Sequence, residues 1–216
     1  MDAISSPRGR EKRTLMPVFK EEQILFYHIP KCGGSRIEEA FGLRHPAKLF
    51  YADCDYLVHD GVSFAPQHYT PAVIERYYPE YAGFKSFCMI RNPLERVISE
   101  YFWFHRDFKK QTIKRFRENR FIDWLREEVS QLNRDHFLPQ RCWASGADQI
   151  FPLHEMNRAF DWIEKETGIK PNLDTHHTKR NALNTAAIAA SLSEQATKAI
   201  HQIYKDDFLL WDHFKS

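Results

Sequence analysis

Residues 23–41 change abruptly from an apolar strand pattern to a glycine-containing loop and then to a helical pattern. Residues 23–29 (Gln-Ile-Leu-Phe-Tyr-His-Ile) form a short apolar and aromatic run typical of a buried strand. Residues 30–34 (Pro-Lys-Cys-Gly-Gly) interrupt that run, and the helical pattern of residues 35–41 ends at Gly42. The segment therefore predicts a strand, a tight loop and a helix in succession.

A second unit of the same kind lies further along the chain. Residues 84–90 (Phe-Lys-Ser-Phe-Cys-Met-Ile) are a strand candidate, after which Arg91 and Asn92 turn the chain. Pro93 suits the first position of a helix, and residues 94–104 continue it. Two strand–turn–helix units indicate a parallel α/β sheet.

The rest of the chain adds weaker strands and several helices. We expect strands at 48–51, 62–65 and 149–153, and helices at 71–78, 117–132, 156–167 and 192–208. The predicted fold is a P-loop-type parallel sheet of about four to five strands, flanked by helices, with a helix-rich C-terminal half. Ligands bind beyond the carboxyl ends of such strands, where the Lys31 loop, the Arg91 turn and the end of strand 62–65 would converge.

Composition limits the functions open to the chain. A length of 216 residues and a net charge of +2 fit one domain that does not bind polyanions as a whole, so we expect no nucleic-acid partner. No apolar run is long enough to cross a bilayer, and the charged N-terminus lacks the apolar core of a signal peptide. The four cysteines have no metal-ligand or paired spacing. We expect a mobile arm over residues 1–20, one domain over 21–216 and a cytoplasmic location.

The loop after the first strand has the chemistry of a phosphate cradle. Glycines allow several backbone N–H groups to point at one place, the following helix N-terminus favours an anion, and Lys31 adds a full charge. The expected anion-binding residues are Pro30, Lys31, Cys32, Gly33, Gly34, Ser35 and Arg36. Because the lysine precedes the glycines, the order differs from G-x-x-x-x-G-K-[ST] and disfavours ATP or GTP hydrolysis. A turn that merely ends a strand is the simpler alternative.

The loop also resembles a known family motif. Residues 28–35 (His-Ile-Pro-Lys-Cys-Gly-Gly-Ser) are similar to the 5'-phosphosulfate loop of sulfotransferases that use 3'-phosphoadenosine 5'-phosphosulfate (PAPS). The likeness is greatest to the branch with carbohydrate 2-O-sulfotransferases and bacterial relatives. Residues 90–101 resemble the 3'-phosphate segment R-[ND]-P-x-x-R-x-x-S-x-Y of that family. This resemblance implies that Arg91 and Ser99 contact the 3'-phosphate.

The resemblance implies transfer of a sulfuryl group from PAPS to a hydroxyl or amine of a small molecule or carbohydrate. The product of the donor is PAP, which is PAPS without its sulfuryl group. No metal is expected, and Lys31 would stabilise charge on the leaving oxygen. A basic late loop often closes the nucleotide pocket in the family, so Lys179 and Arg180 are weaker candidates for donor contacts, with a solvated loop as the alternative. A catalytically silent nucleotide-binding protein and a P-loop kinase are the competing functions.

A histidine is the expected general base because its ordinary pKa lies near neutrality. His68 lies between the two phosphate motifs, in a segment that looks like the place where the family carries its catalytic histidine. His136 is the rival, because Asp135-His136-Phe137-Leu138-Pro139-Gln140 resembles an H-F/W-x-P-Q element that shapes the acceptor side. His136 and Gln140 are therefore expected substrate-binding residues.

Cys32 departs from the threonine that is commoner in the family loop. A thiol is the poorer hydrogen-bond donor, but the backbone N–H of Cys32 would remain available to the donor nucleotide. Its position beside Lys31 at a helix N-terminus suggests a lowered pKa and sensitivity to oxidation.

Overall fold

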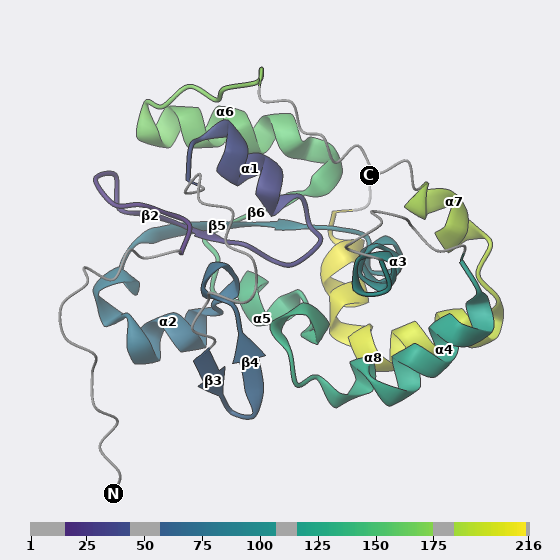
Figure 1. Ribbon diagram of the computed structural model, residues 1–216. Coiled ribbons are helices and arrows are strands. Elements are labelled where there is room, and N and C mark those ends of the chain that lie inside the picture. Colours follow the sequence, from purple (N-terminus) through teal and green to yellow (C-terminus); the bar gives the residue numbers. More distant parts are fainter. Residues whose placement is uncertain (1–15, 44–56, 107–115, 175–183, 215–216) are drawn as a thin grey trace, which may run out of the picture.

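The protein forms a twisted sheet with helices on both faces and a helical bundle beside it (Figure 1). The computed structural model describes residues 16–43, 57–106, 116–174 and 184–214. The main sheet has the order β1 (Val18–Phe19), β2 (Ile24–Tyr27), β5 (Lys85–Ile90), β6 (Gln149–Pro152). β2, β5 and β6 run parallel, and β1 pairs antiparallel with β2 at the edge. The predicted α/β class with a mainly parallel sheet is confirmed.

β5 lies at the centre of the sheet and is buried from its second residue onward. Phe26 of β2 is in register with Phe87 of β5, and their rings stack with centroids 4.8 Å apart. On the other side Cys88 pairs with Ile150 of β6. A parallel strand covered on both faces needs a continuous apolar run rather than an alternating one, which is why residues 84–90 could be identified from sequence.

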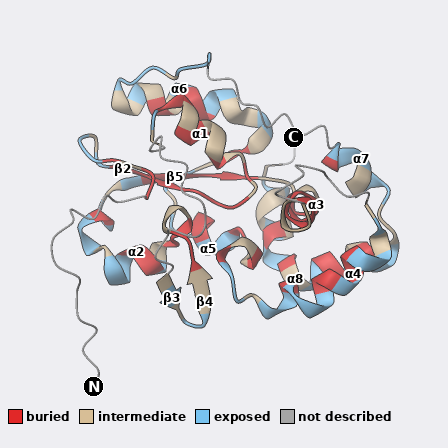
Figure 2. Ribbon diagram, viewed as in Figure 1, coloured by how far each residue is buried: buried red, intermediate tan, exposed pale blue. Residues whose placement is uncertain are grey.

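Helices from different parts of the chain cover the two faces of the sheet. Figure 1 shows α1 (Gly34–Ala40) and α6 (Met156–Thr167) above it, and α2 (Pro71–Tyr77) and α5 (Arg141–Ala144) below it. The sheet strands are almost wholly buried, whereas the outer surfaces of the helices are exposed (Figure 2). The predicted helices at 71–78 and 156–167 are thus present.

The remaining helices pack beside the sheet around a second apolar cluster. They are α3 (Pro93–Phe104), α4 (Glu118–Glu127), α7 (Thr185–Ala190) and α8 (Glu194–Asp212). α3 begins as predicted, with Pro93 in its first turn and the Asn92 side chain accepting the Leu94 N–H at 3.0 Å. Within the described ranges, no helix combines the length and apolar character that crossing a bilayer requires.

Several sequence expectations about these elements were wrong in detail. Strand 62–65 is β4 (Val62–Phe64), which pairs with β3 (Leu57–His59) in a separate antiparallel hairpin and is not a strand of the main sheet. The helix expected to reach residue 132 ends at Glu127, before a 3-10 turn and Leu132 with φ of 48°. α7 was not predicted, and the expected strand 48–51 lies outside the described residues.

The folded part also begins before the predicted boundary at residue 20. Met16 and Phe19 are each 4% exposed, and β1 forms two pairs with β2. Apolar side chains that pack under the sheet edge place this stretch in the fold rather than in a solvated arm. The predicted mobility of residues 1–15 concerns residues that the structure does not describe.

Candidate active site at the carboxyl ends of β2 and β5

The two glycines of the loop between β2 and α1 serve different purposes. Gly33 has φ of 87°, a left-handed conformation that favours glycine. At Gly34, a Cβ atom would lie 2.2 Å from Cδ2 of His28. The His28 ring cannot move away freely, because its Nδ1 lies 2.6 Å from Oε1 of the buried Glu38. His28 is therefore a structural partner of the loop.

Lys31 adopts a strained backbone conformation in this loop. Its φ of 67° is in the left-handed region, which costs a non-glycine residue on the order of 1–3 kcal/mol. The Lys31 carbonyl accepts a long hydrogen bond of 3.4 Å from Nη1 of Arg91, and the Lys31 ammonium lies 5.7 Å from the ring centroid of Trp103. The loop and the Arg91 turn therefore meet at one edge of the sheet, as the strand pattern predicted.

Arg91 has both occupied and unoccupied donors. Its Nη2 donates to Oε2 of Glu95 at 3.0 Å and to Oγ1 of Thr185 at 2.6 Å. Its Nε is buried and has no hydrogen-bond partner among the described residues. Thr185 is a site residue that we did not predict; its only sequence signal was Asn184, whose side chain caps α7 by accepting the Ala187 N–H. Arg91 thus retains a buried donor that can bind an anion.

Arg96 joins the loop to the segment around residue 136. Its Nε donates to the Pro30 carbonyl at 3.1 Å, and its Nη2 donates to the His136 carbonyl at 3.2 Å. The guanidinium is 2% exposed and lies 3.9 Å from the buried carboxylate of Asp207. Ser99 is also buried on α3, and no hydrogen bond joins it to Arg91 among the described contacts. The predicted 3'-phosphate role of Ser99 remains a prediction.

The structure contradicts the lowered pKa that we expected for the Cys32 thiol. Its side chain is fully buried, and Sγ donates to Oε1 of Gln140 at 3.1 Å. Burial raises the pKa of the thiol to about 12, despite the nearby positive charges of Arg96, Arg91 and Lys31. The expectation of a lowered pKa was therefore wrong. The Cys32 backbone N–H donates to the Ile29 carbonyl at 3.3 Å, and the expected contact of Cys32 with the nucleotide stays a prediction.

Gln140 lies beneath the loop rather than on an acceptor surface. It is 1% exposed, and its side-chain amide bonds to both backbone groups of Arg91. In this conformation it is a structural tie between Cys32 and Arg91, and its expected contact with an acceptor stays a prediction. The sequence placed Gln140 in the right region because of its motif, but motif spacing carries no information about which way a side chain points.

His68 lies against the end of β2, as its expected role in the site requires. Its Nδ1 donates to the His28 carbonyl at 2.7 Å, and its Nε2 accepts from the Gln67 amide at 3.0 Å. The ring is edge to face with those of His28 and His136, with centroids 4.7 Å and 5.0 Å away. Burial, together with the neighbouring His28 and His136, lowers the pKa of His68 well below its ordinary value. His68 is therefore a neutral, buried imidazole.

His136 has the opposite electrostatic environment. Its Nδ1 lies 2.8 Å from Oε2 of Glu100, and Trp103 stacks on its ring with centroids 4.6 Å apart. Burial alone would lower the pKa of His136, but the charge and hydrogen bond of Glu100 outweigh it and raise the pKa above its ordinary value.

Among the described residues, no group of three or more His, Cys, Asp or Glu side chains is arranged to hold a metal ion.

The other residues predicted to contact the nucleotide differ in where the structure places them. Arg36 donates to the Leu173 carbonyl at 3.3 Å, which directs it toward the segment after α6. Ser35 is partly buried in the first turn of α1, beside the glycines. Lys179 and Arg180 lie outside the described residues. The contacts of Ser35, Lys179 and Arg180 with a nucleotide stay predictions.

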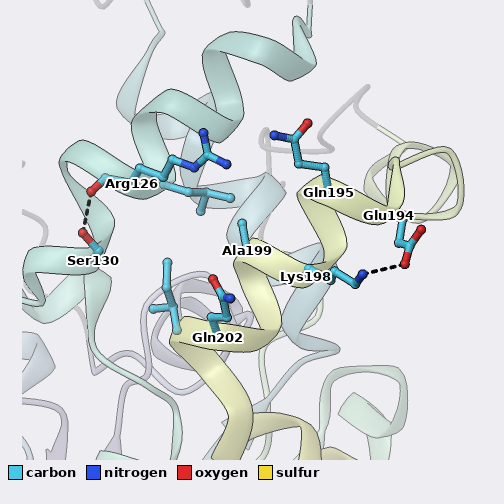
Figure 3. A pocket seen from close by; sticks show the side chains of 9 residues that line it. Arg126, Ser130, Glu194, Gln195, Lys198, Ala199 and Gln202 are labelled. Carbon is cyan, nitrogen blue, oxygen red and sulfur yellow. Dashed lines mark hydrogen bonds and ion pairs between the residues drawn. The ribbon is translucent and has the colours of Figure 1, made fainter.

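A groove elsewhere on the surface does not coincide with this site. It has a volume of about 550 Å³ and lies between α4 and α8, lined by residues that include Arg126, Lys198 and Gln202 (Figure 3). Its charged side chains are partly engaged with their own helix, since Lys198 pairs with Glu194 at 2.7 Å. No predicted site residue lines it, so the predicted chemistry stays at the ends of β2 and β5.

Comparison with known proteins places this arrangement in a family. No curated protein and no solved structure matches the chain. The model of the family described as "Sulfotransferase family" matches residues 16–214, a range that contains the Lys31 loop, the Arg91 turn, His68 and His136. Because this match covers nearly the whole sequence, the chain belongs to the sulfotransferase family.

Proposed function

We propose that this sulfotransferase uses PAPS as its donor and transfers the sulfuryl group to a hydroxyl or amine of a small molecule, for which a carbohydrate is one candidate. Membership of the family supports sulfuryl transfer in general. The donor is inferred from the two motifs, because PAPS carries a 5'-phosphosulfate at one end and a 3'-phosphate on its ribose. A protein that binds it needs two separate anion sites at a fixed distance.

One observation carries the proposal: Arg91 lies against the Lys31 loop and has a buried donor without a partner. The Lys31 carbonyl and Arg91 Nη1 are 3.4 Å apart, so both motifs belong to one site. The unpaired Nε of Arg91 represents a desolvation cost that an anionic ligand would offset. We assign the 5'-phosphosulfate to the Lys31 loop and the 3'-phosphate to Arg91.

In the proposed reaction the acceptor oxygen or nitrogen attacks sulfur in line with the bond to the 5'-phosphate oxygen of the donor. A new bond to sulfur forms while the old sulfur–oxygen bond breaks, and its electron pair stays on PAP. Catalysis of such a transfer consists mainly of positioning and charge stabilisation. Lys31 offsets the negative charge that develops on the leaving oxygen. A histidine accepts the acceptor proton, and His68 and His136 are the candidates.

Calorimetric titration with PAP and with ATP–magnesium tests the proposal. We expect PAP to bind more tightly than ATP–magnesium, and Arg91→Ala to weaken PAP binding by about tenfold or more, which is the loss of one charged hydrogen bond. Arg91→Lys keeps the charge but loses the planar fork, so it should restore only part of the affinity. Arg126→Ala, an exposed site on α4, is the matched control.

A screen of hydroxyl and amine acceptors with radiolabelled PAPS then tests transfer directly. Equal affinity for PAP and ATP–magnesium would contradict the choice of donor. Tight PAP binding without transfer to any acceptor or to water would favour the silent nucleotide-binding alternative over an enzyme.

A further inference from the structure

The pair formed by His136 and Glu100 has the geometry of a base held by a carboxylate. Glu100 is on α3, and His136 is in the 3-10 helix η5 (Asp135–Phe137). Glu100 Oε2 lies 2.8 Å from Nδ1 of His136, and the two side chains are 4% and 12% exposed. A carboxylate at this distance keeps the proton on Nδ1, which leaves Nε2 as the acceptor atom. Nε2 is buried and has no hydrogen-bond partner among the described residues.

The backbone and one ring face of His136 are also held in place. Its backbone N–H donates to Oδ1 of Asp135 at 2.7 Å, and its carbonyl accepts from Arg96 at 3.2 Å. Trp103 covers one face of the ring. Because Arg96 also donates to the Pro30 carbonyl, the same guanidinium sets His136 relative to the loop that carries Lys31. A reacting group needs this kind of fixed geometry to be effective.

His68 is less suited to the same task. Both of its ring nitrogens are engaged, Nδ1 with the His28 carbonyl and Nε2 with the Gln67 amide. His68 is 2% exposed, and among the described residues no carboxylate pairs with its ring to stabilise a proton there. Accepting a proton at Nε2 would break the Gln67 bond and place an uncompensated charge among His28 and His136, which is unfavourable in a buried setting.

We propose that His136 is the general base of the sulfuryl transfer and that Glu100 is its positioning residue. This inference rests on the proposed function and assigns the base to a different histidine from the one that the sequence favoured. The proton of the acceptor moves to Nε2 of His136 as the acceptor atom bonds to sulfur. PAP departs with the electron pair of the broken sulfur–oxygen bond, and the imidazolium later releases the proton to solvent.

The charges around His136 determine how the rate responds to pH. Glu100 and Asp135 raise its pKa, whereas burial and the Lys31 ammonium lower it. The Arg96 guanidinium and the neutral His68 ring are its other ionisable neighbours. Since only the neutral imidazole accepts a proton, the transfer rate should rise with pH through the pKa of His136. Glu100→Gln removes one negative charge, so the midpoint of that rise should move to lower pH.

Single-turnover transfer from radiolabelled PAPS, combined with calorimetry for PAP, tests the assignment. The acceptor is the one found in the screen, or water if none is found. His136→Gln should slow transfer by roughly 10²–10⁴-fold, the usual contribution of a general base, while its PAP affinity stays within about twofold of wild type. His68→Gln is the competing variant and should lose less. His213→Gln, exposed after α8, should transfer at the wild-type rate.

Three results would overturn the assignment: wild-type transfer by His136→Gln, a larger loss in His68→Gln than in His136→Gln, or an unmoved pH midpoint in Glu100→Gln. The last measurement serves even if His136→Gln folds poorly, because Glu100→Gln keeps a hydrogen-bond acceptor for Nδ1. Failure of the proposed function gives a different pattern, in which the wild-type protein itself neither binds PAP nor consumes PAPS.

Discussion

The side-chain amide of Gln140 bonds to both backbone groups of Arg91: Oε1 accepts the N–H at 2.8 Å, and Nε2 donates to the carbonyl at 2.9 Å. β5 ends one residue earlier, at Ile90, so the amide continues the hydrogen-bond ladder beyond the strand. The same Oε1 accepts the Cys32 thiol at 3.1 Å. One buried side chain therefore sets the spacing between the Arg91 turn and the Lys31 loop.

Gln140→Leu should destabilise the protein by about 2–4 kcal/mol, because it leaves the N–H and C=O groups of Arg91 without partners. PAP binding should weaken as well, since Arg91 and Cys32 lose their common support. Urea unfolding and calorimetry measure the two effects. Gln149→Leu, an exposed site at the start of β6, is the control. A Gln140→Leu variant with wild-type stability would show that the hydrogen bonds of the Gln140 side chain contribute nothing to the free energy of unfolding.

Asp207 and Asp206 are adjacent on α8 but should respond very differently to neutralisation. Asp207 is fully buried, accepts the backbone N–H groups of Gln140 and Arg141 at 2.9 Å and 3.0 Å, and faces Arg96. Asp207→Asn leaves a buried arginine without its nearest counter-charge, which should cost about 3 kcal/mol or more. Asp206 is about half exposed and pairs with Arg141 at the surface, so Asp206→Asn should cost less than about 1 kcal/mol. Equal losses in urea unfolding would contradict the structural difference.

Gly34→Ala should severely disturb the Lys31 loop, because the new Cβ atom would lie 2.2 Å from Cδ2 of the His28 ring. The ring is held by Glu38, so the overlap must move the loop or break the buried His28–Glu38 contact. We expect a loss of at least about 2 kcal/mol, within the range for overpacking, together with weakened PAP binding. Gly83→Ala meets nothing within 4 Å and should be close to neutral. Thermal unfolding of both variants measures how much stability each added methyl group costs.

Two buried thiols should make the protein less stable at alkaline pH. Burial raises the pKa of Cys32 to about 12 and also raises that of Cys88, whereas unfolded thiols titrate near pH 8.5. Because the folded pKa exceeds the unfolded one, the full stability is present below about pH 8 and declines as the pH rises toward the folded values. Each thiol can contribute a slope of up to about 1.4 kcal/mol per pH unit. Urea unfolding of Cys88→Ser should show a shallower decline than wild type between pH 9 and about 11.

Thiol labelling checks the same burial independently. In a Cys54→Ser background, the exposed Cys142 should react first, and Cys32 and Cys88 should react only as the protein unfolds. If Cys32 reacted fastest, the raised pKa would be wrong and the lowered value expected from the sequence would be favoured.

The strands and the convergence of the two phosphate motifs were predictable from sequence for a local reason. Residues 87–90 are all apolar because this part of β5 is buried on both faces, and Lys31 and Arg91 follow parallel neighbours whose carboxyl ends meet at one edge. β4 was misplaced because its short alternating pattern fits a separate hairpin as well as an edge strand. α7 was missed because six residues of mainly alanine carry little periodic signal.

Hydrophobic periodicity and motif spacing are properties of short segments, so the sequence alone predicted the α/β class, the two basic motifs and sulfuryl transfer in general. Which polar groups come into contact depends instead on the tertiary structure. Cys32 and Gln140 are 108 residues apart, and Glu100 and His136 are 36 apart, yet each pair is in hydrogen-bonding contact. Burial and charge partners set the pKa of a thiol or an imidazole, and both depend on distant segments. For that reason the loop around Lys31 could be predicted from a short stretch of sequence, while the burial of Cys32 within it and the pairing of His136 with Glu100 could not.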